Sequence, residues 1–254
     1  MSLGVLVLAR LNSTRLPGKM MLPILGRPLI TLLSERLFAS GFTGPYILAT
    51  STSPSDNPLA ELGSQLGFQC FRGSEEDVVD RMNAAMKHFG LGFAVIIEGD
   101  ELFVDSKVIT ALTSLASKKE YNVIKVKSGP IGSWITGIRF QSIEDINRTK
   151  GDTSTDGWTD LLKDIPSQIS IDYDPPLPCF DKKVRLTIDY PQDLHLASEI
   201  YQLIGKNGDV HSLHKVLNLL RERPDLIAIN SELDEIYWKR LRAQQSKFKP
   251  NKIK

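Results

Sequence analysis

The sequence predicts an α/β fold in which a mostly parallel β-sheet carries helices on both faces. Short aliphatic runs, of which residues 4–9 form the first, alternate along the chain with segments that are apolar at helical spacing, of which residues 28–40 form the first. Strands that are apolar throughout are typical of parallel sheets that are buried on both faces. Repeated strand–helix units of this kind imply right-handed crossovers, and 254 residues suffice for one main domain with embellishments.

Turn and cap residues set the expected limits of these elements. Pro28 suits the first turn of a helix and Gly41 suits its end, whereas Ser74 followed by Asp77 resembles an N-terminal capping arrangement. We expect strands at residues 4–9, 46–50, 69–71, 93–97, 122–126, 135–140 and 184–188. We expect helices at residues 28–40, 57–66, 75–89, 108–115, 141–150, 156–163, 191–204 and 212–220.

The composition is that of an ordinary soluble globular protein, with 41% apolar and 24% charged residues. A formal net charge of +1 argues against a bulk electrostatic grip on nucleic acid. We interpret the basic residues of 239–254 as a frayed helix and solvated tail rather than a nucleic-acid or membrane arm. Cys70 and Cys179 lack the spacing of a disulfide framework or zinc site, and the apolar start lacks a basic leader, so we expect a cytoplasmic protein.

The loop that follows the first expected strand carries the strongest sign of an anion site. Arg10, Arg15 and Lys19 fall within ten residues and alternate with Ser13, Thr14 and Gly18, which supply hydroxyl groups and a close backbone approach. Such a loop can surround phosphate oxygens with charge-assisted hydrogen bonds. The alternative is a polar loop whose basic residues face water. Neither the P-loop pattern nor the GxGxxG fingerprint is present in the sequence.

Two acidic residues follow other expected strands. Asp100 comes after residues 93–97, and Asp189 comes after residues 184–188. Ligands of open α/β sheets bind outside the carboxyl ends of the strands, where carboxylates can hold Mg²⁺. Two such acids that face a group of cations suit metal-assisted phosphoryl or nucleotidyl transfer. We interpret Asp193, at the start of the next helix, as an N-terminal helix charge.

Several motifs resemble those of the CMP-sugar synthetases, which include the CMP-Kdo and acylneuraminate cytidylyltransferases. The first motif is the run from Ala9 to Lys19, with Leu22-Pro23 and Gly26-Arg27-Pro28-Leu29-Ile30 after it. The branch that it resembles most is the spore coat polysaccharide biosynthesis protein F branch. That branch also shows Ala49-Thr50-Ser51, Phe71-Arg72-Gly73-Ser74 with Asp77 and Arg81, and Val184-Arg185-Leu186-Thr187-Ile188-Asp189.

The resemblance implies a Rossmann-like nucleotidyltransferase fold, CTP as the nucleotide donor, and a homodimer. It implies transfer of CMP to a small-molecule hydroxyl acceptor that is sugar-acid-like or related, with release of pyrophosphate, in surface polysaccharide biosynthesis. By this analogy the cofactor Mg²⁺ is held by Asp100 and Asp189, and the catalytic residues are Lys19, Arg10 and Asp100. The implied nucleotide-binding residues are Leu8, Ala9, Arg10, Ser13, Arg15, Lys19, Arg72, Ser74 and Arg81.

The chain departs from the family pattern in two places. Glu98 and Glu101 flank Asp100, where they would raise carboxylate pKa values by like-charge repulsion or enlarge the metal site. The middle of the chain lacks the motifs of the branch, so we expect its notable residues to be packing or surface residues: Trp134, Asp152, Asp156 and Trp158.

These features give the expected organisation and the alternatives to it. We expect a single nucleotidyltransferase domain at residues 1–238, with residues 129–181 as an insertion for the acceptor or for dimerisation, and a basic tail at residues 239–254. The first alternative is a guanylyl- or uridylyltransferase of the same fold. The second is a catalytically degenerate subunit that binds a nucleotide.

Overall fold

A seven-stranded sheet forms the centre of the protein. The computed structural model describes residues 1–118, 121–126, 128–151, 157–174, 176–180, 184–205 and 210–245. The strand order is β5-β4-β1-β6-β8-β7-β9. The strands are β1 (Leu3–Leu8), β4 (Tyr46–Ser51), β5 (Gln69–Gly73), β6 (Phe93–Glu98), β7 (Val123–Val126), β8 (Ile135–Arg139) and β9 (Gln168–Ile171). All neighbouring pairs are parallel except those that β8 forms with β6 and β7, so the predicted, mostly parallel sheet is confirmed.

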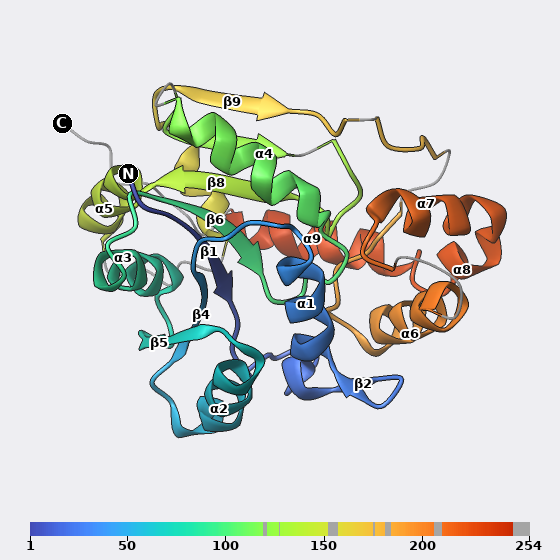
Figure 1. The fold of residues 1–254 in the computed structure, drawn as a ribbon. Coiled ribbons are helices and arrows are strands. Elements are labelled where there is room, and N and C mark those ends of the chain that lie inside the picture. The colour runs from blue at the N-terminus through green and yellow to red at the C-terminus, as the bar shows by residue number, and fades with distance from the viewer. Residues whose placement is uncertain are drawn as a thin grey trace.

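Helices cover both faces of this sheet, as predicted. They are α1 (Leu29–Phe38), α2 (Asn57–Leu66), α3 (Val78–His88), α4 (Ser106–Ser117), α5 (Phe140–Thr149), α6 (Pro191–Gly205), α7 (Leu213–Glu222), α8 (Pro224–Ala228) and α9 (Leu233–Gln245). One apolar core lies between the sheet and α1, α2 and α4, and a second lies between the sheet and α3 and α5. Figure 1 shows α6, α7 and α8 grouped at one side of the sheet. Among the described helices, none is both long and apolar enough to cross a membrane.

One strand prediction was wrong, and one strand of the sheet was not predicted. The sheet includes β9, where no strand was expected, whereas residues 184–188 form no strand. This segment makes a single parallel bridge, between Ile131 and Arg185. Two of its backbone N–H groups donate to loops, since Leu186 donates to Ile131 O at 2.7 Å and Ile188 donates to Asp100 O at 3.0 Å. The apolar run is therefore buried as core, and its end lies directly beside the end of β6.

Two of the expected helices also differ from the observed ones. The helix expected at residues 75–89 begins at Val78, because the side chain of Asp77 accepts a hydrogen bond from Asp80 N and caps it. The segment expected at residues 156–163 is a 3₁₀ helix, η3 (Trp158–Leu162), while residues 152–156, with Asp152 and Asp156, lie outside the described residues. The last helix, α9, runs to Gln245, and the domain boundary expected at residue 238 stays a prediction.

The long loop between β1 and α1 is held by a buried acid. It contains a short 3₁₀ helix, η1 (Lys19–Met21), and a small hairpin of β2 (Pro23–Ile24) and β3 (Arg27–Pro28). Asp56, at the end of η2 (Pro54–Asp56), is almost fully buried and accepts a hydrogen bond from Leu11 N at 2.7 Å. Its second oxygen accepts one from Ser51 N at 3.2 Å. A loop tied in this way to the end of β4 presents its cations from a fixed position.

Gly132 allows the turn before β8 to lie directly on the backbone of the 184–189 segment. It has a φ of +91°, and a Cβ placed on it would lie 2.1 Å from Thr187 N. We expect Gly132→Ala to lower the free energy of unfolding by roughly 3 kcal/mol more than Gly90→Ala, because overpacking is added to the backbone strain that both substitutions share. Gly90 is the matched control, since it has a φ of +62° and nothing lies within 4 Å of the position that a Cβ would take there. Equal urea midpoints for the two variants would contradict this.

Candidate active site

A cleft of about 440 Å³ opens at the carboxyl ends of β1 and β6. The β1–β6 register sets Leu8 opposite Glu98, and both residues line the cleft. The cleft is lined by most of the residues that we expected to bind the nucleotide or the metal: Leu8, Ala9, Arg10, Ser13, Arg15, Lys19, Arg81, Asp100 and Asp189. Arg72 and Ser74 are not part of the described lining. The structure thus brings most of the expected residues together, while their roles toward a ligand stay predictions.

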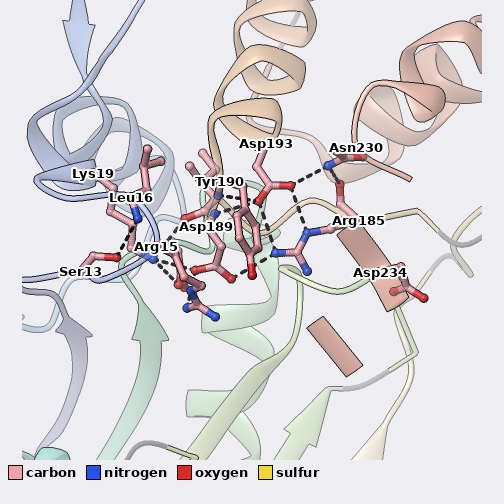
Figure 2. A network of polar contacts seen from close by, with 12 residues as sticks. Ser13, Arg15, Leu16, Lys19, Arg185, Asp189, Tyr190, Asp193, Asn230 and Asp234 are labelled. Atoms are coloured by element: carbon pink, nitrogen blue, oxygen red, sulfur yellow. Dashed lines mark hydrogen bonds and ion pairs between the residues drawn. The ribbon is translucent and has the colours of Figure 1, made fainter. Parts of the chain in front are cut away.

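The ammonium group of Lys19 lies between the two acids that were expected to converge. Its Nζ donates to Asp100 Oδ2 at 2.6 Å, to Asp189 Oδ1 at 3.0 Å and to Ile188 O at 3.1 Å. Arg15 adds a second cation, with its Nη2 2.6 Å from Asp189 Oδ1. Figure 2 shows Lys19 and Arg15 entering from the loop side and Asp189 facing them. Three segments far apart in the chain therefore meet at one buried charge.

Burial and charge act against each other in this group. Burial alone would lower the pKa of Lys19, but Asp100 and Asp189 more than offset it and raise that pKa. Burial raises the pKa of Asp100, which the charge of Lys19 offsets only in part. Burial also opposes ionisation of Asp189, yet the charges of Lys19 and Arg15 outweigh it and lower the pKa of this carboxyl. Asp189 is the acid of the pair that ionises more readily.

A second buried network holds Asp189 from behind. The Arg185 guanidinium is 3.2 Å from Asp189 Oδ2 and donates from Nε to Asp193 Oδ1 at 3.0 Å. Asp193 Oδ2 accepts hydrogen bonds from the backbone N–H groups of Asp189 and Tyr190, and Asn230 donates to Asp193 Oδ1 at 2.8 Å. Figure 2 shows Asp193 between Arg185 and Asn230. The expectation that Asp193 is only a helix charge was therefore wrong, because it also pairs with a buried cation and fixes the Asp189 backbone.

The remaining predicted cations lie around the turn before α3. Arg10 Nη1 donates to Glu75 O at 2.8 Å, and Arg81 Nη1 donates to Ser74 O at 2.5 Å. The Arg10 contact holds the loop after β1 against the segment that follows β5, and both arginines line the cleft.

Arg72 is hydrogen-bonded outside the described cleft lining, and its expected role toward a nucleotide stays a prediction. Its guanidinium donates to Ser51 O at 2.8 Å, to Ser53 O at 2.7 Å and to Asn57 Oδ1 at 2.6 Å. It thereby fixes the segment that carries Asp56. The oxygen of Ser13 also serves the loop itself, since Leu16 N donates to it at 3.4 Å.

Glu98 and Glu101, the acids beside Asp100, line the cleft and form hydrogen bonds that the sequence did not predict. The indole of Trp158 donates to Glu98 Oε1 at 3.0 Å, and Glu98 N donates to Glu101 Oε2 at 3.0 Å. Burial first, and Asp100 second, raise the pKa of Glu98 to about 7, and burial with Glu98 raises the pKa of Glu101 well above its usual value. The pKa values of these carboxyls are raised, as expected, but burial contributes more to the increase than like-charge repulsion does.

Both cleft tryptophans have defined hydrogen-bond partners. Trp158 is buried and, as expected, packs in the core, yet it also lines the cleft. The Trp134 indole donates to Gly129 O at 2.8 Å, and Trp134 lines the cleft as well. Thr136 and Tyr237 complete this end, and no sequence pattern marked either of them. The one signal in the sequence is that Tyr237 is an aromatic residue in a mostly polar helix, α9.

In this α/β fold, the cations of one loop face two carboxylates at the edge of a mostly parallel sheet, an arrangement that suits a nucleotidyltransferase. The family model described as cytidylyltransferase matches residues 4–156, which is more than half of the chain, so the chain belongs to the cytidylyltransferase family and is a nucleotidyltransferase. The expected kinship with CMP-sugar synthetases is thereby confirmed.

Relatives agree with this assignment. The chain is 27% identical over 227 residues to the spore coat polysaccharide biosynthesis protein SpsF of Bacillus subtilis, covering 87% of this chain and 94% of that protein. It is 28% identical over 153 residues to the 3-deoxy-manno-octulosonate cytidylyltransferase of Psychrobacter cryohalolentis, covering 58% of this chain and 56% of that protein.

Solved structures share the fold. A cytidylyltransferase from Leptospira borgpetersenii serovar Hardjo-bovis gives a TM-score of 0.77 at 23% identity, over 89% of this chain and 97% of that one. A CMP:2-keto-3-deoxy-manno-octonic acid synthetase in complex with CTP gives 0.61 at 16% identity, over 80% of this chain and 99% of that one. The expected Rossmann-like nucleotidyltransferase fold is confirmed.

Asp193 offers a test of the network behind Asp189. We expect Asp193→Asn to lower the free energy of unfolding by about 3 kcal/mol, because it leaves the buried guanidinium of Arg185 with one charged partner fewer. The measurement is urea denaturation followed by circular dichroism. The matched control is Asp225→Asn, which removes an exposed partner of Arg223 and should leave the midpoint unchanged. If the two variants have the same midpoint, the network does not stabilise the fold as argued.

Proposed function

We propose that the protein transfers CMP from CTP to a hydroxyl group of a sugar-acid-like or related acceptor and releases pyrophosphate, for the synthesis of a surface polysaccharide. The observation that carries the proposal is the position of Lys19 between Asp100 and Asp189, in a cleft that Arg10, Arg15 and Arg81 also line. The names of the relatives support CTP as the nucleotide donor and polysaccharide synthesis as the pathway that uses the product.

The cations of the loop suit a triphosphate. Arg10, Arg15 and Lys19 come from one anchored loop, so they offer several N–H donors to phosphate oxygens from a fixed position. Donors that are positioned before the reaction stabilise charge as it develops on the leaving pyrophosphate. The acceptor hydroxyl would attack the α-phosphorus from the side opposite the leaving group. Positioning and charge neutralisation are then the main contributions of the chain.

Asp100 and Asp189 fit a Mg²⁺ ion. One cation already lies within 3.0 Å of an oxygen from each of them, and Mg²⁺ prefers oxygen ligands of this kind. Among the described residues, no group of three or more histidine, cysteine or acidic side chains could hold a metal. The two carboxylates would therefore hold the ion together with phosphates and water, as Mg²⁺ sites near nucleotides commonly do. When bound, the ion would neutralise charge on the reacting phosphates.

Metal dependence of nucleotide binding gives the first test. We expect CTP at about one hundred times its Kd to raise the Tm by roughly 5–10 °C when Mg²⁺ is present, because ligand binding stabilises the native state. EDTA and Asp100→Asn should each remove most of this shift. The control is Asp225→Asn, whose exposed carboxylate lies outside the cleft lining and which should respond as the wild type does. A CTP shift that persists in EDTA would overturn the metal assignment.

Nucleotide choice and the role of Lys19 give the second test. We expect pyrophosphate release with CTP, Mg²⁺ and a pool of sugar acceptors, and none with GTP or UTP. Lys19→Met should lower this rate by about 10²–10³-fold, because it removes a donor to the leaving group. Lys107→Met is the control, since Lys107 is exposed on α4.

Each other outcome of this assay supports a named alternative. Turnover with GTP or UTP alone would make the protein a guanylyl- or uridylyltransferase. Binding of CTP without pyrophosphate from any acceptor would favour a degenerate nucleotide-binding subunit.

A further inference from the structure

The cations in the described lining of the cleft are gathered at one end of it. They come from the loop after β1 and from α3, and they are Arg10, Arg15, Lys19 and Arg81. The turn before β8, β8 itself, the 184–189 segment and α9 contribute four residues without charge: Trp134, Thr136, Thr187 and Tyr237. We call these four residues the uncharged end of the cleft.

The proposed function brings the acceptor to the uncharged end. In an in-line displacement the attacking and leaving oxygens lie on opposite sides of the phosphorus. Since the pyrophosphate leaves toward the cations of the loop, the acceptor approaches from the side away from that loop. The uncharged end lies on this side, because β8 follows β6 on the side away from β1, and Thr136 of β8 is paired with Ile96 of β6. Thr187 lies against the turn before β8, where Gly132 permits the close approach.

The C-terminal helix α9 brings an aromatic ring to this end. Figure 1 shows α9 leading from the group of α6, α7 and α8 back toward β6, and Tyr237 of α9 lines the cleft. The ring of Tyr237 lies over Arg185, with the guanidinium carbon 4.9 Å from the ring centroid. Arg185 is buried, and its Nη1 has no hydrogen-bond partner among the described residues. The ring therefore stabilises the part of this cation that no oxygen reaches, and the cation fixes the ring in turn.

The hydroxyl group of Tyr237 is a hydrogen-bond donor that still needs a partner. Among the residues that the structure describes, none accepts a hydrogen bond from it. Tyr237 is half-buried, and tyrosine hydroxyls that are withdrawn from water usually have a partner. Burial first, and nearby carboxylates of the cleft second, raise the pKa of Tyr237 to about 12, so the hydroxyl keeps the proton that it would donate. A molecule bound in the cleft can supply the missing oxygen.

We propose that Tyr237 binds the acceptor, with its hydroxyl group donating a hydrogen bond to an oxygen of the sugar-acid-like molecule. The carboxylate and hydroxyl oxygens of such a molecule both accept bonds of this kind. Arg185 positions the ring of Tyr237 and also lies 3.2 Å from Asp189 Oδ2, so one buried cation serves the acceptor residue and the proposed metal ligand. This inference rests on the proposed function. It adds a specificity-determining residue from a helix that lies beyond residues 4–156, which match the family model.

Removal of the hydroxyl group alone tests this assignment. Tyr237→Phe keeps the ring over Arg185 and deletes only the donor. Pyrophosphate release by the wild type, with CTP, Mg²⁺ and a set of sugar acids that includes 3-deoxy-manno-octulosonate, selects the acid with the highest kcat/KM as the probe. Tyr237→Phe should raise the KM of this probe about tenfold, because one hydrogen bond to it is lost, and should change the KM of CTP by less than about twofold.

A neighbouring residue of α9 separates this role from a merely structural one. Trp238→Phe is the matched control, since it also leaves a phenylalanine and deletes one donor. The indole of Trp238 donates to Asp234 Oδ1 at 3.1 Å, and neither residue is part of the described cleft lining. Trp238→Phe should therefore leave the KM of the probe unchanged. If Tyr237 only held α9 in place, its ring would suffice, and Tyr237→Phe would also keep the wild-type KM.

The outcomes distinguish this inference from the proposed function. A KM of the probe that stays within about twofold of the wild-type value in Tyr237→Phe would overturn the inference and leave CMP transfer intact. An equal rise in the KM of CTP would overturn the inference as well, because the hydroxyl group would then contact the nucleotide. Absence of pyrophosphate release by the wild type with every sugar acid would instead overturn the proposed function, and the inference with it.

Discussion

The rest of the site depends on the contacts that the buried ammonium group of Lys19 makes with Asp100 and Asp189. It joins the loop after β1, the end of β6 and the end of the 184–189 segment, which contribute Lys19, Asp100 and Asp189. Two carboxylates this close and this buried would repel each other strongly without a cation between them. The loop can deliver that cation because Asp56 anchors its start, and Asp189 can receive it because the network around Arg185 fixes its backbone.

The parts that the sequence predicts well depend on short-range patterns. An apolar run followed at once by a polar loop identifies β1 and the cations after it, and the same logic identifies β6 and Asp100. Because parallel strands end at one edge of a sheet, these two groups were expected to meet, and they do. Asp189 also lies beside the residues expected near it. The reasoning was partly wrong, because the segment before Asp189 is buried in the core but is not a strand.

The parts that the sequence does not predict depend on contacts between distant segments. The partner of Glu98 is Trp158, sixty residues further along, and no periodicity links them. Asp193 has the spacing of a first-turn acid, so its pairing with buried Arg185 has no local signal. Arg72 is another case, because the sequence gives no sign that its guanidinium binds the segment at residues 51–57. A motif fixes which residue is present, and only the tertiary structure fixes what it touches.

The division of the cleft has a consequence for how such proteins diverge. The cations of the loop belong to the stretch that matches the family, whereas Trp158, Asp160 and Tyr237 lie past its end at residue 156. Two of these sit on a short 3₁₀ helix and one on α9, and neither element is a strand of the sheet. None of the three side chains donates to or accepts from Lys19 in the contacts that hold its ammonium group. Side chains on such peripheral elements can therefore vary among proteins of one fold while the cations of the loop keep their positions.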